Sequence, residues 1–146
     1  MTNRTPKYWI IRASKDHVKS GVKGGFAQAC HGKAGPLKRM KNGDFVIYYS
    51  SKTAFEKKDK CQAFTAIGRV KDDQVYPFEL SPDFCPFRLD IEFFDAQDVS
   101  ILPLIEELEF IPNKQKWGYP FRWGTLQINE HDFQLISTLM LDGQAH

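Results

Sequence analysis

Residues 45–49 have the sequence Phe-Val-Ile-Tyr-Tyr, and residues 63–70 have the sequence Ala-Phe-Thr-Ala-Ile-Gly-Arg-Val. Both runs are apolar and rich in β-branched and aromatic residues, so each predicts a buried β-strand. The lysine-rich segment between them is polar and predicts a hairpin loop. Gly68 interrupts the second run and indicates a bulge or a close approach of another chain segment. We therefore expect a sheet at the centre of the fold.

Further strands and helices are predicted on both sides of this pair. Tyr8–Ile11 is apolar and predicts another buried strand, whereas residues 87–93 alternate apolar and charged side chains like a strand with one polar face. Weaker patterns predict strands over 75–80 and 125–128, helical turns over 14–18 and 36–40, and a short helix over 101–108. We expect Gly21, Gly24 and Gly25 to end the first turn.

The chain closes with a predicted helix after Asn129, which is a favoured N-cap residue. Its expected apolar face contains Phe133, Ile136, Leu139 and Met140.

This order of elements predicts an α+β fold. Strands joined by short loops favour a bent, mixed or antiparallel sheet of about five to six strands, curled into a small barrel, with short helices and a C-terminal helix around it. A doubly wound parallel sheet is excluded because strands and helices do not alternate. The 146 residues fit a single domain, 1–146, without a linker or an internal repeat.

The composition indicates a cytoplasmic globular protein. Hydrophobic residues make up 42% of the chain and charged residues 26%, which is ordinary for such proteins. No run of about 18 apolar residues occurs, so we expect no contact with a membrane. The three cysteines, Cys30, Cys61 and Cys85, are widely spaced and predict reduced thiols rather than a disulfide framework. Nothing in the sequence indicates the oligomeric state.

Charge is distributed unevenly along the chain. Residues 1–71 hold sixteen Lys and Arg against four Asp and Glu, whereas residues 72–146 hold four against fourteen. Either one face of the molecule is basic and attracts phosphates, or the two halves interleave and their fields cancel. Two basic clusters are the candidates for such a face: Lys33, Lys38, Arg39 and Lys41, and Lys52, Lys57, Lys58 and Lys60.

The sequence contains no pattern that indicates catalysis. The four histidines are scattered, so no metal site is expected, and neither a phosphate-binding glycine loop nor a G-x-S-x-G elbow occurs. Cys30 stands beside His31, but a nucleophile and its base usually meet through the fold rather than along the chain. We therefore expect neither a cofactor nor a metal, and we favour a binding function.

Three polar segments are unusually rich in aromatic residues. They cover residues 24–33, 81–88 and 116–124, and the last holds four aromatics in nine residues. An aromatic face with nearby amide and hydroxyl groups suits a nucleobase, which stacks on it and is selected by hydrogen bonds at its edge. The alternative is that these aromatics fill the core. The candidate base-binding residues are Phe26, Ala27, Gln28, Tyr48, Phe84, Phe87 and Trp123.

The same segments, in order, resemble the motifs of one family, the EVE domain, which is a member of the PUA-like superfamily related to the YTH and ASCH domains. The similarity is closest to small bacterial proteins that consist of an EVE domain and little else. The matching stretches are residues 8–10, 24–28, 31–33, 36–40, 43–44, 48–50, 62–70, 86–88, 108–111, 117–124 and 132–136.

This resemblance implies a PUA-like pseudobarrel and a reader that holds a modified base in an aromatic cage beside a basic surface. It implies Phe26 as the first aromatic wall, with Ser14 and Gln28 facing the edge of the base. The second wall is Phe84 or Phe87, and Trp123 is a further candidate. Phe26 stands where YTH domains use Trp, so a modified cytosine in DNA is expected no less than N6-methyladenine.

The resulting prediction is a non-catalytic module that binds DNA or RNA through a modified or extruded base. Its expected phosphate contacts are Lys33, Lys38, Arg39 and Arg88. The alternative is an ASCH-like enzyme or sensor that acts on a modified nucleoside or a free nucleotide. Such an enzyme would draw on Tyr48, Arg88 and Asp90 in the same pocket.

Overall fold

The computed structural model describes residues 5–29, 32–54 and 59–142. Its strands are β1 (Tyr8–Arg12), β2 (Phe26–Ala27), β3 (Phe45–Lys52), β4 (Lys60–Val70), β5 (Tyr76–Pro77), β6 (Phe87–Phe93), β7 (Val99–Ser100) and β8 (Thr125–Ile128). Its α-helices are α1 (Lys15–Gly24), α2 (Ala34–Lys38) and α3 (Glu130–Met140). Short 3₁₀ helices cover Leu102–Leu104, Lys114–Lys116 and Tyr119–Trp123.

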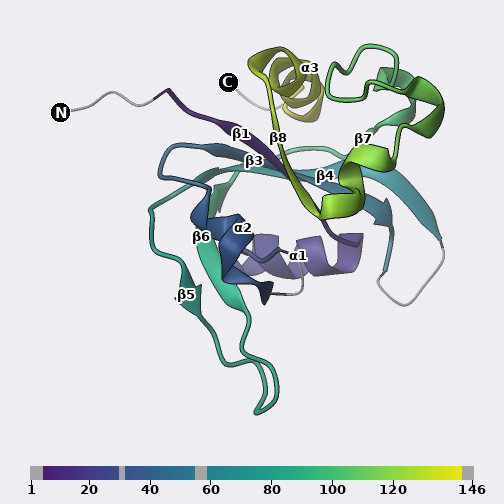
Figure 1. Ribbon diagram of the computed structural model, residues 1–146. Coiled ribbons are helices and arrows are strands. Elements are labelled where there is room, and N and C mark those ends of the chain that lie inside the picture. Colours follow the sequence, from purple (N-terminus) through teal and green to yellow (C-terminus); the bar gives the residue numbers. More distant parts are fainter. Residues whose placement is uncertain (1–4, 30–31, 55–58, 143–146) are drawn as a thin grey trace.

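The strands form one curled sheet in the order β2-β6-β4-β3-β1-β8, with β5 beside β6 and β7 beside β4 (Figure 1). β1 and β3 are parallel, with Tyr8 opposite Phe45, and all other printed pairings are antiparallel. The predicted α+β fold with a bent mixed sheet and a C-terminal helix is therefore confirmed. The five longer strands match the expected number, and the other three contain only two residues each, too few to show a sequence period.

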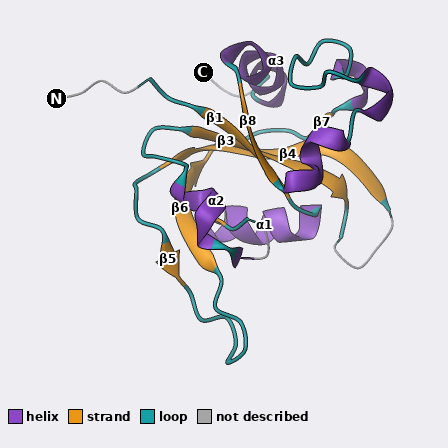
Figure 2. Ribbon diagram, in the orientation of Figure 1, coloured by secondary structure: helices purple, strands orange, loops and turns teal. Residues whose placement is uncertain are grey.

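Helices cover both faces of the sheet, with α1 and α2 on one side and α3 on the other (Figure 2). In β3, Val46 and Tyr48 belong to the core cluster that contains Val18 of α1, whereas Ile47 belongs to the cluster that contains Phe133 of α3. Strands buried on both faces have continuous apolar sequences rather than alternating ones. This two-sided burial explains the unbroken run at residues 45–49.

Helix α1 is longer than predicted. It continues through Gly21 to Gly24 and ends at Gly25, whose φ of 75° suits glycine. A Cβ atom at Gly21 would lie 2.7 Å from the carbonyl oxygen of Phe26, and one at Gly24 would lie 2.4 Å from Cε2 of the Phe26 ring. The two glycines therefore allow Phe26 to pack directly against the helix, and their use here is close packing rather than helix termination.

Other differences from the predicted elements are local. The strand expected over 75–80 is only Tyr76–Pro77, since Pro77 has no N–H to extend the pairing. The helix expected over 101–108 is a 3₁₀ turn at Leu102–Leu104. Asn129 caps α3 as predicted, through an acceptor bond from the Asp132 N–H at 2.9 Å. Leu139 lies outside the buried face of α3, because each helical residue turns by about 100°.

Gly68 allows β6 to pack closely against β4. A Cβ atom at this position would lie 2.6 Å from the carbonyl oxygen of Glu92 and 3.0 Å from Cα of Phe93. We expect Gly68→Ala to lower the free energy of unfolding by about 1–3 kcal/mol, because backbone atoms cannot move aside as a side chain does. Gly35→Ala is the matched control, because a Cβ atom there meets nothing within 4 Å. Urea unfolding of both variants measures the effect, and equal stability of the two would contradict it.

Candidate functional site

A cavity of about 740 Å³ opens where β1 ends and α1 begins. Its walls come from the turn after β1, from α1, from the segment after β2, from the end of β3, and from the β5–β6 loop that extends away from the body (Figure 1). Its volume lies in the range of about 300–1,000 Å³ that is typical of small-molecule sites. No described helix is long and apolar enough to cross a membrane.

The structure brings many of the predicted site residues together here. Five of the predicted base-binding residues line the cavity, together with one predicted phosphate contact: Ser14, Phe26, Gln28, Tyr48, Phe84 and Arg88. Ala27 does not line it, because it is fully buried in the core. Phe87 packs against the core cluster beneath α1 and α2. Trp123 lies outside the cavity with 67% of its surface exposed.

Strand alternation explains this division. Phe26 pairs with Asp90, and Ala27 pairs with Leu89, so Phe26 and Asp90 face one side of the sheet while Ala27 and Leu89 face the core. Phe87 is two residues from Leu89 and shares its side, whereas Arg88 shares the side of Phe26. The predicted strand therefore sends its polar face toward the cavity.

Arg88 is held by contacts from two neighbouring strand segments. Its Nε donates a hydrogen bond to Oε1 of Gln28 at 2.7 Å. Its guanidinium carbon lies 3.7 Å from the ring centroid of Phe26 and 3.8 Å from that of Phe78. Cation–π contacts of this geometry orient the planar guanidinium between two aromatic rings. One arginine therefore fixes Phe26 and Gln28 relative to each other.

Two hydroxyl groups near the cavity have fixed roles. The buried Tyr48 hydroxyl donates to the backbone carbonyl of Gln28 at 3.4 Å, and burial raises the pKa of Tyr48 far above its usual value. The Tyr76 hydroxyl donates to Oδ1 of Asp90 at 2.6 Å, and burial followed by this hydrogen bond raises the pKa of Tyr76 to about 12. Both tyrosines therefore stay protonated at neutral pH and serve as donors.

Ser14 and the rim show where sequence reasoning was incomplete. Ser14 precedes α1 as expected, but its Oγ donates to the Asp16 carboxylate at 2.5 Å instead of accepting from the helix backbone. The lining also includes Arg12, His17, Ser20 and Lys52, which the analysis of the sequence did not select as pocket residues. Arg12 carries a detectable signal, since it is the one charged residue in an otherwise apolar strand.

Charge at the cavity has one sign. Among the described residues, those that line it include Arg12, Lys52 and Arg88 but no Asp or Glu. The basic and acidic halves of the chain share the sheet, yet their charges do not cancel at this place. The predicted phosphate contacts Lys33, Lys38 and Arg39 are exposed but do not line the cavity. Lys57, Lys58 and the Cys30–His31 pair lie outside the described residues.

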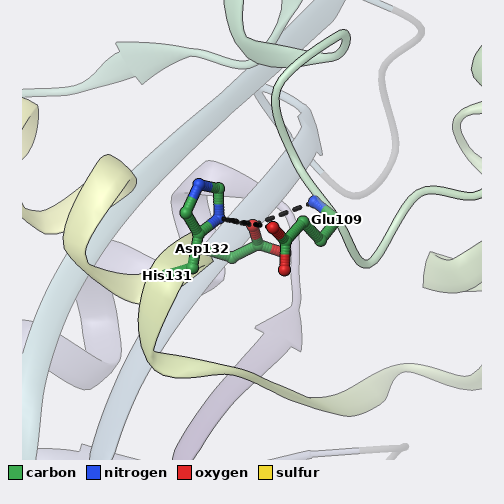
Figure 3. A group of neighbouring side chains, drawn as sticks. All are labelled: Glu109, His131 and Asp132. Atoms are coloured by element: carbon green, nitrogen blue, oxygen red, sulfur yellow. Dashed lines mark hydrogen bonds and ion pairs between the residues drawn. The ribbon is translucent and has the colours of Figure 1, made fainter.

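A second group of polar side chains lies at the start of α3 (Figure 3). In the described part of the chain, Glu109, His131 and Asp132 form one group whose ligand atoms lie within 4.8 Å of one another. The fully buried Asp132 accepts the backbone N–H groups of Glu109 at 2.9 Å and Phe110 at 2.8 Å. His131 Nδ1 lies 2.9 Å from Oδ1 of the same carboxylate. These contacts explain the group as a joint between α3 and the preceding loop.

We expect the pKa of His131 to lie above its ordinary value of about 6.5. The hydrogen bond to Asp132 raises it most, while the nearby Glu109 adds a smaller effect in the same direction. Its contribution to stability is therefore complete below the unfolded pKa and is lost as pH rises through the folded pKa. NMR titration of the His131 ring measures this pKa. Glu109→Gln should lower it slightly and Asp132→Asn should lower it more, and an unchanged value in both variants would contradict the assignment.

Comparisons with known proteins identify relatives of the chain. The model of the EVE domain family matches residues 7–139. The UPF0310 protein of Mycolicibacterium vanbaalenii is 46% identical over 138 residues, which cover 94% of this chain and 95% of that protein. The UPF0310 protein YdcG of Bacillus subtilis is 41% identical over 133 residues and 91% of each chain.

Two solved structures are similar in fold. The YTH domain of Zygosaccharomyces rouxii MRB1, in complex with N6-methyladenosine RNA, superposes with a TM-score of 0.60 and 14% identity over 100% of this chain and 91% of that one. Human THYN1, in complex with DNA that contains 5-methylcytosine, has a TM-score of 0.52 and 12% identity over 91% and 96% of the two chains. At these identities the similarity concerns the fold, and the expected PUA-like fold is confirmed.

Proposed function

This chain belongs to the EVE domain family, and we propose that it binds nucleic acid as a non-catalytic module and holds one modified or extruded base in the cavity beside Arg88. Two proteins of similar fold carry such ligands, one an RNA with N6-methyladenosine and the other a DNA with 5-methylcytosine. Their low sequence identity leaves the base recognised by this chain as part of the proposal.

The observation that carries the proposal is the arrangement of Phe26, Gln28 and Arg88 in a cavity without acidic lining residues. A base needs an aromatic or guanidinium plane to stack on and hydrogen-bonding groups at its edge. Phe26 and Arg88 supply the planes, Gln28 supplies an amide, and Phe84 supplies a second apolar wall from the β5–β6 loop.

The rim supplies the charge for the flanking backbone. Arg12 and Lys52 line the cavity from β1 and β3, so phosphates on either side of a bound base would meet cations. These two residues replace Lys38 and Arg39 as the proposed principal phosphate contacts, with Lys33 close by in sequence to the lining residue Gly32. Extruding a base from a duplex costs a few kcal/mol, so we expect unpaired or mismatched positions to be preferred.

Fluorescence anisotropy with short labelled strands tests the function. The strands carry unmodified bases, 5-methylcytosine, 5-hydroxymethylcytosine or N6-methyladenine, each as DNA and as RNA. We expect one modified strand to bind more tightly than its unmodified counterpart. We also expect log K to fall with log salt at a slope of about −2 to −3, which corresponds to three or four neutralised phosphates on a single strand.

Competition by free nucleotides separates this function from a sensor of small molecules. A mononucleotide that competes as strongly as the strand, with no dependence on salt, would overturn nucleic-acid binding in favour of the sensor. Equal binding of every strand would contradict the base-reading part of the proposal and leave only a basic surface.

A further inference from the structure

The short 3₁₀ helix that leads into β8 exposes two large aromatic rings beside the cavity. Tyr119 is 60% exposed and Trp123 is 67% exposed. Between them in sequence, Phe121 is buried and stacks on Tyr49 with ring centroids 4.1 Å apart and an interplanar angle of 12°. This internal stack anchors the turn to the core, so the outward rings stand on a fixed support.

Arg122 orders the exposed side of this turn. Its Nη1 donates to the backbone carbonyl of Tyr119 at 2.9 Å. Its guanidinium carbon lies 3.4 Å from the Tyr119 ring centroid and 4.4 Å from the Trp123 ring centroid. The turn therefore presents two aromatic rings grouped around one positive charge, a combination that suits stacked bases and their phosphates.

The position of the turn connects it to the cavity. Gly124, the residue after Trp123, lines the cavity, and its carbonyl accepts the backbone N–H of Arg12 at 2.8 Å. Arg12 itself is part of the basic rim. A strand that leaves the cavity past Arg12 would meet the Tyr119–Trp123 turn next.

We infer that the turn Tyr119–Trp123 is a stacking site for the nucleotide next to the one held in the cavity. This inference rests on the proposed function, since it assumes that a nucleic-acid strand enters the cavity. The recognised chemistry is an unpaired nucleobase of any identity, because every base has a π-face. Arg122 adds attraction to the adjoining phosphate.

The experiment compares a fluorescein-labelled pentathymidylate DNA with unlabelled thymidine monophosphate as a competitor. The variants are Trp123→Ala, Trp123→Phe and the control Leu102→Ala, which removes a side chain that is 53% exposed on another 3₁₀ helix. We expect Trp123→Ala to weaken pentanucleotide binding by roughly 10-fold and Trp123→Phe to weaken it by less than about 3-fold, because a phenyl ring still stacks. Mononucleotide competition should be unchanged in all variants.

Tryptophan emission gives a second readout, because Trp9 is buried and Trp117 is half-buried whereas Trp123 is exposed. We expect the pentanucleotide to quench the wild-type emission and to leave that of Trp123→Phe nearly unchanged. Pentanucleotide binding that is the same in the wild type and in Trp123→Ala would overturn the inference alone. A wild-type protein that binds no strand in this assay or in the modified-base panel would overturn the proposed function and the inference together. Binding of strands without quenching would again assign the turn to another partner, such as a protein.

Discussion

Replacing Phe26 by Ala should weaken binding of the preferred modified strand by about 10- to 100-fold, since one base–aromatic stack contributes roughly 1–3 kcal/mol. The ring also covers one face of the Arg88 guanidinium, with 3.7 Å between the guanidinium carbon and the ring centroid. Its removal therefore loosens the arginine as well. Anisotropy titration with the modified strand and its unmodified counterpart measures the change.

Phe78→Ala provides the matched control for this change. Phe78 contacts the other face of Arg88 at 3.8 Å but does not line the cavity. Its loss should loosen Arg88 without removing a cavity wall, so the affinity should fall by less than in Phe26→Ala. The weak, salt-dependent binding of unmodified strands should persist in both variants. If Phe26→Ala retained the full preference for the modified strand, the cavity would not be the base-binding site.

Much of the fold could be predicted because burial leaves a local pattern. The runs at residues 45–49 and 63–70 are apolar on both faces of the sheet, and this requirement is visible without knowledge of their neighbours. The length of α1 could not be predicted, because Gly21 and Gly24 normally weaken a helix. Their use depends on the contact with Phe26, which is a tertiary feature.

The candidate site divides along the same line. Alternation over 87–93 already separates Phe87 on the apolar side from Arg88 on the polar side, so the strand pattern holds part of the answer. No local pattern brings Arg12 and Lys52 to one rim, because they meet through the parallel pairing of β1 with β3. The role of Arg88 likewise needed the pairing of β6 with both β2 and β5.

Asp44→Ala should lower the free energy of unfolding by about 3–5 kcal/mol, the range expected when a buried hydrogen-bonded carboxylate is removed and its donors lose their acceptor. Asp44 is fully buried at the start of β3. Its Oδ1 accepts the Lys7 N–H, and its Oδ2 accepts the Trp9 Nε1–H and the Lys41 N–H, each at 3.0 Å. One side chain thus ties the segment before β1, β1 itself and the turn before β3.

Asp73→Ala isolates the effect of burial in this comparison. Asp73 accepts the backbone N–H of Asn42 at 2.7 Å, in the same turn, but on the exposed surface. Water replaces that acceptor, so the loss should stay within about 0.5 kcal/mol. Urea unfolding followed by Trp9 fluorescence measures both variants. Equal losses would show that the turn needs any acceptor, whereas a large loss in Asp44→Ala alone would mean that joining β1 to β3 is what requires the carboxylate. Because Arg12 and Lys52 come together through that parallel pair, the same variant should also weaken strand binding at temperatures where it is still folded.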